Sequence, residues 1–163
     1  MCTVGRRASV AQGRALLGVW ERSLLPSLAA SRREENGKGI EVLKNMSALV
    51  RRTPSDEGLP YASAHLPPLF GTLSALLGLS LEQTAYVYLL SHVKALLSAA
   101  VRASIFGPYQ AQKVLAGEGV QEGIRREIER TWSRNWEESG QVVPVLDLWV
   151  GRHEMLYSRI FNS

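Results

Sequence analysis

The sequence is poor in the residues that build disulfides and metal sites. Its one cysteine is Cys2, so no disulfide can form within the chain, and such low cysteine content suits a reducing compartment. Its three histidines, His65, His92 and His153, are far apart, and none belongs to an H-x-x-x-H pair. We therefore expect a cytoplasmic protein without a metal site of its own.

Signatures of catalysis are also missing. The segment Gly37-Lys38-Gly39 lacks the upstream glycine and the following Ser or Thr of a phosphate-binding loop, and no G-x-S-x-G turn occurs. No spacing of serine, histidine and aspartate singles out a triad. These absences predict a protein that is not an enzyme and has no cofactor. A small helical enzyme, whose catalytic groups are distant in sequence, stays an alternative.

The chain has no long run of one charge. Its 19 Lys and Arg residues against 15 Asp and Glu give a net charge of +4. Nucleic-acid binders usually gather positive charge on one stripe, whereas here acids and bases interleave, as in a solvated helix face. The interleaved residues are Arg125, Arg126, Arg130 and Arg134 with Glu122, Glu127, Glu129, Glu137 and Glu138. A helical nucleic-acid-binding module is thus only the alternative prediction.

Sustained alternation of apolar and polar residues, the pattern of strands, is absent as well, and helical spacing takes its place. With 163 residues, 45% of them apolar, the chain is long enough to bury one core. The prediction is an all-α fold, a single-domain helical bundle spanning 1–163.

The first half of the chain contains several helix signals. Ser9 and Gln12 have the spacing of a capping box, and apolar residues follow at helical intervals until Pro26 stops or kinks the helix. A second helix is expected over 37–52, with Ile40, Leu43, Met46 and Val50 on one face, followed by a loop at 53–60.

A helical hairpin is predicted next. Pro67 and Pro68 suit the first turn of its first helix, and Gly78 suits the position just after that helix ends. A second capping-box pattern, from Ser80 to Gln83, opens a helix over about 81–106, which is apolar almost all round. Because charged residues interrupt it, we predict a central buried helix and not a membrane span.

The remainder of the chain predicts three further helices. The expected ranges are 109–115, 121–136 with Ile124, Ile128, Trp132 and Trp136 on its apolar face, and a last helix starting at Pro144.

Three segments together resemble the UreF family of urease accessory proteins. The first is Arg7 to Leu17, which is similar to a Ser-x-x-Gln-Gly helix of that family. The second runs from His65 to Arg102, with the Ala-Val-Arg ending of the family's central hairpin and a matching glutamine at Gln112. The third, Arg152 to Ser163, resembles the family's C-terminus and is the most specific signal. The family's N-terminal Gly- and Ser-rich segment is missing.

This resemblance implies a role as a non-catalytic scaffold. UreF proteins bind UreD (also called UreH), recruit the GTPase UreG and dock on apo-urease, so that the complex, and not UreF itself, handles nickel. The family also implies a homodimer for the full-length protein, and without its N-terminal segment we expect this dimer to fail. No nucleic acid and no membrane are expected as partners.

The resemblance also nominates partner-binding residues, each with a structural alternative. Arg102 either contacts a partner or a nickel path, or is buried against a carboxylate such as Glu82 or a backbone carbonyl. Gln112 holds either a partner's backbone or the turn at Gly107-Pro108. The 152–163 tail either docks on a partner or frays. Its nominated residues are His153, Glu154, Tyr157, Arg159, Ile160 and Phe161; His153 with Glu154 either touches nickel in transit or is simply surface.

Overall fold

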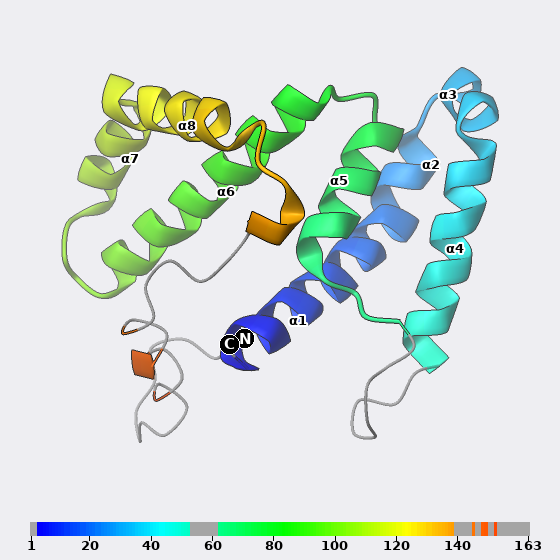
Figure 1. Cartoon of the computed structure of the whole chain (residues 1–163), viewed down its shortest axis with the longest axis horizontal. Coiled ribbons are helices and arrows are strands. Elements are labelled where there is room, and N and C mark those ends of the chain that lie inside the picture. The colour runs from blue at the N-terminus through cyan, green and yellow to red at the C-terminus, as the bar shows by residue number, and fades with distance from the viewer. Residues whose placement is uncertain (1–2, 53–61, 139–144, 146–147, 150–151, 153–163) are drawn as a thin grey trace. The chain divides into compact units, whose positions relative to one another are not determined.

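The structure, a computed structural model, describes residues 3–52, 62–138, 145, 148–149 and 152. Helices make up all the regular structure in these residues, and no strand occurs among them, so the all-α prediction is confirmed (Figure 1). The chain divides between Ser80 and Leu81 into two compact units. Each unit is described separately below, and the predicted single domain stays a prediction.

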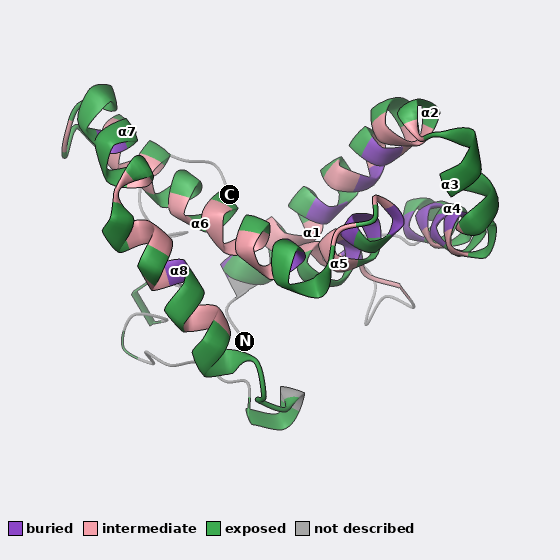
Figure 2. Cartoon of the chain, turned by 90° about the horizontal axis from the view of Figure 1, so that it is seen from above, coloured by how far each residue is buried: buried purple, intermediate pink, exposed green. Residues whose placement is uncertain are grey.

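The first unit contains six helical elements around one core. They are α1 (Thr3–Val19), a π-helical turn η1 (Trp20–Leu24), α2 (Leu25–Ser27), α3 (Ala30–Glu35), α4 (Gly37–Arg52) and α5 (Leu66–Leu76). Helix α5 lies against α1 (Figure 1). The buried core consists of Leu17, Trp20, Ile40, Leu43, Val50, Ala64, Leu69, Leu73 and Leu76. Figure 2 shows buried segments, in purple, on α1, α4 and α5.

Local signals placed these helices well. On α4, Ile40, Leu43 and Val50 are buried as expected, and Met46 is half-buried. The two prolines lie in the first turn of α5. At its other end Gly78 has φ +83°, and the Leu79 amide donates to the Ser74 carbonyl at 3.0 Å, which is a Schellman ending.

The helix ends near Pro26 as predicted, but a π-helical turn also contributes to this ending. The π-helical turn η1 precedes it, with the Leu25 amide donating to the Trp20 carbonyl, five residues back. Proline lacks the amide that would bond to the carbonyl of Arg22, four residues back, so regular α-helical pairing cannot continue there. The helix then ends at Ser27, and Leu28 is extended.

Ser9 does not begin a helix, so the first predicted capping box is wrong. Helix α1 already starts at Thr3, and Ser9 faces α5 instead. Its Oγ accepts a hydrogen bond from the Leu66 amide at 3.1 Å and lies 3.3 Å from Nδ1 of His65. One turn later, Gly13 is so close to Ala64 that a Cβ would lie 1.9 Å from the Ala64 carbonyl oxygen. Ser9 and Gly13 therefore fix the entry into α5.

A polar cluster ties α4 to the π-helical turn. The Ser47 hydroxyl donates to Oε1 of Glu21 at 2.6 Å, and Arg51 pairs with the other carboxylate oxygen. Ser47 is buried, so its hydroxyl needs this partner.

The second unit consists of α6 (Leu81–Arg102), α7 (Pro108–Ala116), α8 (Glu118–Thr131) and a 3-10 turn η2 (Trp136–Glu138). Both α7 and α8 pack against α6. Gln121 joins the three, since it accepts a hydrogen bond from the Tyr86 hydroxyl and donates from Nε2 to the Leu115 carbonyl at 3.1 Å. The final predicted helix, from Pro144, falls largely outside the described residues.

Helix α6 is not a buried central helix, which corrects the prediction for 81–106. Among its residues only Thr84 is buried, and Leu96 is 71% exposed. Figure 2 shows α6 coloured mostly as intermediate and exposed. Within its unit, α7 and α8 are too short to surround a helix of 22 residues. By length and composition α6 could cross a membrane, but the same test is passed by core helices of soluble proteins, so it carries little weight.

The predicted ends of two helices also change. Helix α6 stops at Arg102 and not at Phe106, because Ser104 takes a left-handed conformation with φ 58°. The Ile105 amide then donates to the Ala100 carbonyl at 3.0 Å, which completes a Schellman ending on serine. Helix α8 begins at Glu118 and ends at Thr131, earlier than the expected 121–136. Trp132 is 53% exposed and outside the helix.

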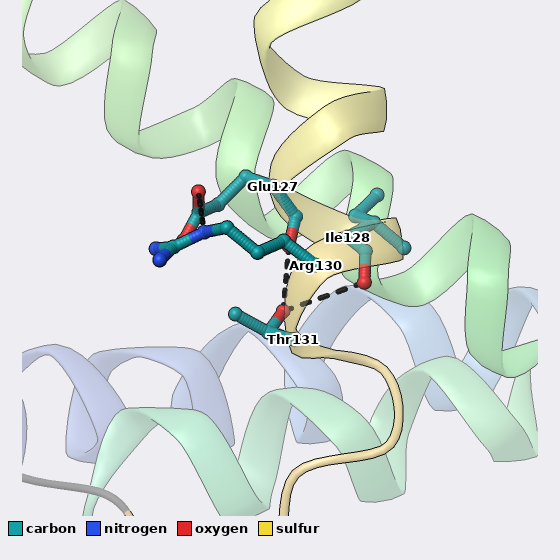
Figure 3. Close-up of polar contacts among 4 residues, drawn as sticks. All are labelled: Glu127, Ile128, Arg130 and Thr131. Carbon is teal, nitrogen blue, oxygen red and sulfur yellow. Dashed lines mark hydrogen bonds and ion pairs between the residues drawn. The ribbon is translucent and has the colours of Figure 1, made fainter.

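The charged face of α8 contains an ion pair of the expected kind. Arg130 donates from Nη2 to Oε1 of Glu127 at 2.6 Å and from Nε to Oε2 at 3.0 Å, three residues apart (Figure 3). The Thr131 hydroxyl donates to the Glu127 carbonyl at 2.7 Å (Figure 3). Hydrogen bonding from Arg130 lowers the pKa of the Glu127 carboxyl.

We expect Arg130→Gln to raise the pKa of Glu127 toward its ordinary value. Because the folded pKa is the lower one, the stabilisation by this pair is present above the unfolded pKa and is lost as pH falls through the folded pKa. An NMR titration of the Glu127 carboxyl carbon measures the shift. Arg126→Gln removes a neighbouring charge that does not bond Glu127; an equal shift in this control would contradict the assignment to Arg130.

Candidate functional site

A groove between α6 and α7 brings together two of the nominated residues. Arg102, the last residue of α6, and Gln112, in the middle of α7, both line it. The groove has a volume of about 300 Å³. Its remaining lining residues are Lys94, Leu97, Ser98, Val101, Pro108, Ala111 and Leu115. We call this site the α6–α7 groove.

The connection between the two helices positions this groove. The left-handed Ser104 ends α6, and Gly107 and Pro108 then start α7, with the Ala111 amide donating to the Gly107 carbonyl at 3.1 Å. Proline fits this first turn because its missing amide would have no partner there. The chain therefore reverses within five residues, and α7 packs back onto the last turns of α6.

Arg102 is exposed, so the buried alternative is wrong. Its Nε donates to the Ser98 carbonyl at 3.4 Å, and its Nη2 donates to the Ser98 hydroxyl at 3.3 Å. Glu82 cannot reach it, because twenty residues of α-helix span about 30 Å. The backbone-carbonyl part of that alternative is correct, since Ser98 supplies the carbonyl.

Gln112 is also exposed, and its side chain makes no hydrogen bond to the described residues. The turn at Gly107-Pro108 is held by backbone bonds instead. Of its two predicted roles, the structure thus gives no support to the one in the turn. The amide of Gln112 faces a groove in which it can still donate and accept.

Lys94 is a groove residue that sequence reasoning missed. It lies two helical turns before Arg102, with Ser98 midway, so the three share one face of α6. Lys94 is exposed, and among the described residues its ammonium makes no hydrogen bond or ion pair. The i, i+4, i+8 spacing was the available signal, but the position of α7 was needed to interpret it.

The six nominated residues of the C-terminal tail lie outside the described residues, and their docking role stays a prediction. They are His153, Glu154, Tyr157, Arg159, Ile160 and Phe161.

A second groove, of about 420 Å³, lies between α6 and α8. Its described lining residues mix charges, with Glu82, Glu129 and Arg125, and also include the apolar Val87 and Ile128. No three His, Cys, Asp or Glu side chains in the described part of the chain are close enough to hold a metal ion. Of the two grooves, the α6–α7 groove is the one that contains nominated residues.

The fold and this groove define a class of protein, an all-helical chain with a surface groove whose charged lining residues, among those described, are Lys94 and Arg102. The UreF family model matches residues 2–117, which include both Arg102 and Gln112. The chain belongs to the UreF family.

Individual relatives agree with the family model. The chain is 35% identical over 162 residues to a protein of Schizosaccharomyces pombe described as an uncharacterized urease accessory protein UreF-like, a match that covers 99% of this chain and 63% of that protein. It is 28% identical to urease accessory protein 6 of Cryptococcus neoformans, over 98% of this chain and 58% of the relative.

A plant relative is equally informative. The chain is 32% identical to urease accessory protein F of Oryza sativa subsp. japonica, over 97% of this chain and 52% of the relative. The chain thus spans between 52% and 63% of the length of these three proteins. No solved structure matches it.

Proposed function

We propose that this protein is a urease maturation factor, a non-catalytic scaffold that binds UreD (also called UreH) and recruits the GTPase UreG, so that nickel enters apo-urease. The observation that carries this proposal is the match of the UreF family model over residues 2–117. In this role nickel is cargo of the complex, and the chain needs no cofactor of its own. The proposed location is the cytoplasm.

Two surfaces of the chain serve this role in the proposal. One is the α6–α7 groove, which Arg102 and Gln112 both line. The other is the C-terminal tail, whose Tyr157, Arg159 and Phe161 are of the residue types enriched in binding hot spots or in interface cores.

The proposal is tested by capture of purified UreD on the immobilised chain, with and without residues 157–163. We expect the whole chain to retain UreD and the shortened chain to lose most of this binding, because anchor residues contribute most of the binding free energy. Circular dichroism shows whether both chains keep their helices. A folded whole chain that retains no UreD would overturn the proposed function.

A further inference from the structure

One serine of the chain follows closely on two positive charges. Pairs of adjacent arginines occur at 6–7, 32–33, 51–52 and 125–126, and only the first pair lies two and three residues before a Ser or Thr. The sequence there reads Arg6-Arg7-Ala8-Ser9-Val10. Protein kinases select substrates partly by charge, and carboxylates of a kinase can pair with arginines at these two positions. The pattern is typical of the substrate of a kinase that selects basic segments.

The arginines of this motif are on the surface, whereas the serine faces α5. Arg6 and Arg7 are exposed, and Ser9 is half-buried. The Oγ of Ser9 accepts a hydrogen bond from the Leu66 amide at 3.1 Å and lies 3.3 Å from Nδ1 of His65. A kinase must place this hydroxyl in line with the γ-phosphate of ATP. Ser9 therefore has to leave α5 before it can accept a phosphate.

The part of α1 around Ser9 is weakly anchored. Residues 5–12, all of which the structure describes, include none that is buried. Val4 is buried but does not belong to the core cluster, to which α1 contributes the buried Leu17. Segments with few buried apolar contacts open locally at a lower free-energy cost than the whole fold. The first turns of α1 can thus separate from α5 while the core stays folded.

A phosphate on Ser9 does not suit the closed arrangement. It adds three oxygen atoms and a charge of about −1.5 to −2 at pH 7. One turn along α1, a single Cβ on Gly13 would already lie 1.9 Å from the Ala64 carbonyl oxygen, so α1 is very close to the segment before α5. The start of α5 attracts an anion only weakly, because Pro67 and Pro68 lack two of the amides that a first helical turn normally offers. We expect steric exclusion to outweigh this attraction.

We propose that Ser9 is a phosphorylation site for a protein kinase that selects basic substrates, and that the phosphate keeps the first turns of α1 apart from α5. In the transfer, Oγ of Ser9 attacks the γ-phosphorus of ATP, and its proton passes to the catalytic carboxylate of the kinase. The bond from the γ-phosphorus to the bridging oxygen breaks, and ADP leaves. The coupling is reciprocal, because opening exposes Ser9 and the phosphate favours the open form. The inference goes beyond the proposed function and does not depend on it.

Phosphorylation of the whole chain by the catalytic subunit of cyclic-AMP-dependent protein kinase, with ATP, tests the site. This kinase accepts the Arg-Arg-x-Ser pattern, and mass spectrometry of proteolytic fragments should locate the phosphate on Ser9. Arg6→Gln should lower kcat/KM about tenfold or more, because a charge-assisted hydrogen bond to the kinase is lost. Arg14→Gln is the matched control, since it makes the same change at an exposed position of α1 outside the motif and should have little effect.

Two glycine variants test whether Ser9 must leave α5. Gly13→Ala places a Cβ against Ala64, so it should populate the open form and raise the rate of Ser9 phosphorylation about tenfold. Gly71→Ala, where a Cβ would meet nothing within 4 Å, should leave the rate unchanged. A free peptide of residues 3–14 gives the rate of the fully open segment, and the whole chain should be slower in proportion to its open fraction. Circular dichroism shows whether the variants keep their helices.

Hydrogen exchange of the phosphorylated chain measures the effect of the phosphate. The amides of residues 5–12 should exchange about tenfold faster than in the unmodified chain, while those of α4 keep their rates. No phosphate on Ser9, or an equal loss of rate in the two arginine variants, would overturn the assignment of the site. Equal rates in the two glycine variants, or unchanged or slower exchange over 5–12, would overturn the opening, since the phosphate would then be accommodated at the start of α5.

Discussion

Replacing Trp20 by alanine is expected to lower the free energy of unfolding by about 3–5 kcal/mol. The Trp20 side chain is only 1% exposed and is one of the two largest fully buried side chains among the described residues. It belongs to the same buried cluster as Leu43 and Leu69, so its removal leaves a cavity between helices that cannot all close in. Urea unfolding followed by circular dichroism measures the loss.

Two further variants separate packing from other effects at this position. Trp132→Ala removes an equal side chain that is 53% exposed, and the change should cost less than about 1 kcal/mol. Trp20→Phe should cost less than Trp20→Ala, because it refills most of the volume and because Nε1 of Trp20 makes no hydrogen bond to the described residues. Equal losses at Trp20 and Trp132 would contradict this account of the core.

The boundaries of α4 and α5 could be predicted because their signals are local. The prolines of the first turn of α5 and the left-handed Gly78 each act within a few residues. Ser104 shows the limit of such signals. Serine has little preference for a left-handed conformation, so the sequence indicated an end at Phe106, before the Gly107-Pro108 break and four residues beyond the observed last residue of α6.

The low burial of α6 could not be predicted for a different reason. A run of apolar side chains indicates that a helix needs cover, but not which element supplies the cover. Ser9 illustrates the same gap, since a serine three residues before Gln12 suits a capping box and a contact with a distant helix equally well. The contact that decides the role of Ser9 is with Leu66, 57 residues further along the chain.

Only some residues of the candidate site could be predicted from the sequence. Arg102 and Gln112 came from resemblance to the family, and the structure places them in one groove. Lys94 appeared in the sequence only as an interruption of an apolar helix. Its importance depends on the packing of α7 against the same turns of α6, which no spacing within α6 reveals.

Substitution of Gly13 by alanine should destabilise the protein by about 2–3 kcal/mol, although alanine is the better helix former by about 1 kcal/mol. The added Cβ would lie 1.9 Å from the carbonyl oxygen of Ala64 and 3.1 Å from Cδ1 of Leu69. Ala64 is fully buried, and Ser9 holds the adjacent Leu66 amide, so this backbone cannot simply move aside. Helix α1 must then separate from α5.

A glycine on the facing helix provides the matched control for this prediction. Gly71 lies within α5, and a Cβ there would meet nothing within 4 Å, so Gly71→Ala should stabilise the protein by about 0.5–1 kcal/mol. Opposite signs in the two urea unfolding curves would show that Gly13 is required for close helix approach. If Gly13→Ala also stabilised the protein, α1 and α5 could not be as close as the structure has them. Packing thus explains the serine and the glycine in the family's Ser-x-x-Gln-Gly pattern. Ser9 accepts a hydrogen bond from the Leu66 amide at the start of α5, and Gly13 leaves room for the Ala64 backbone that precedes α5.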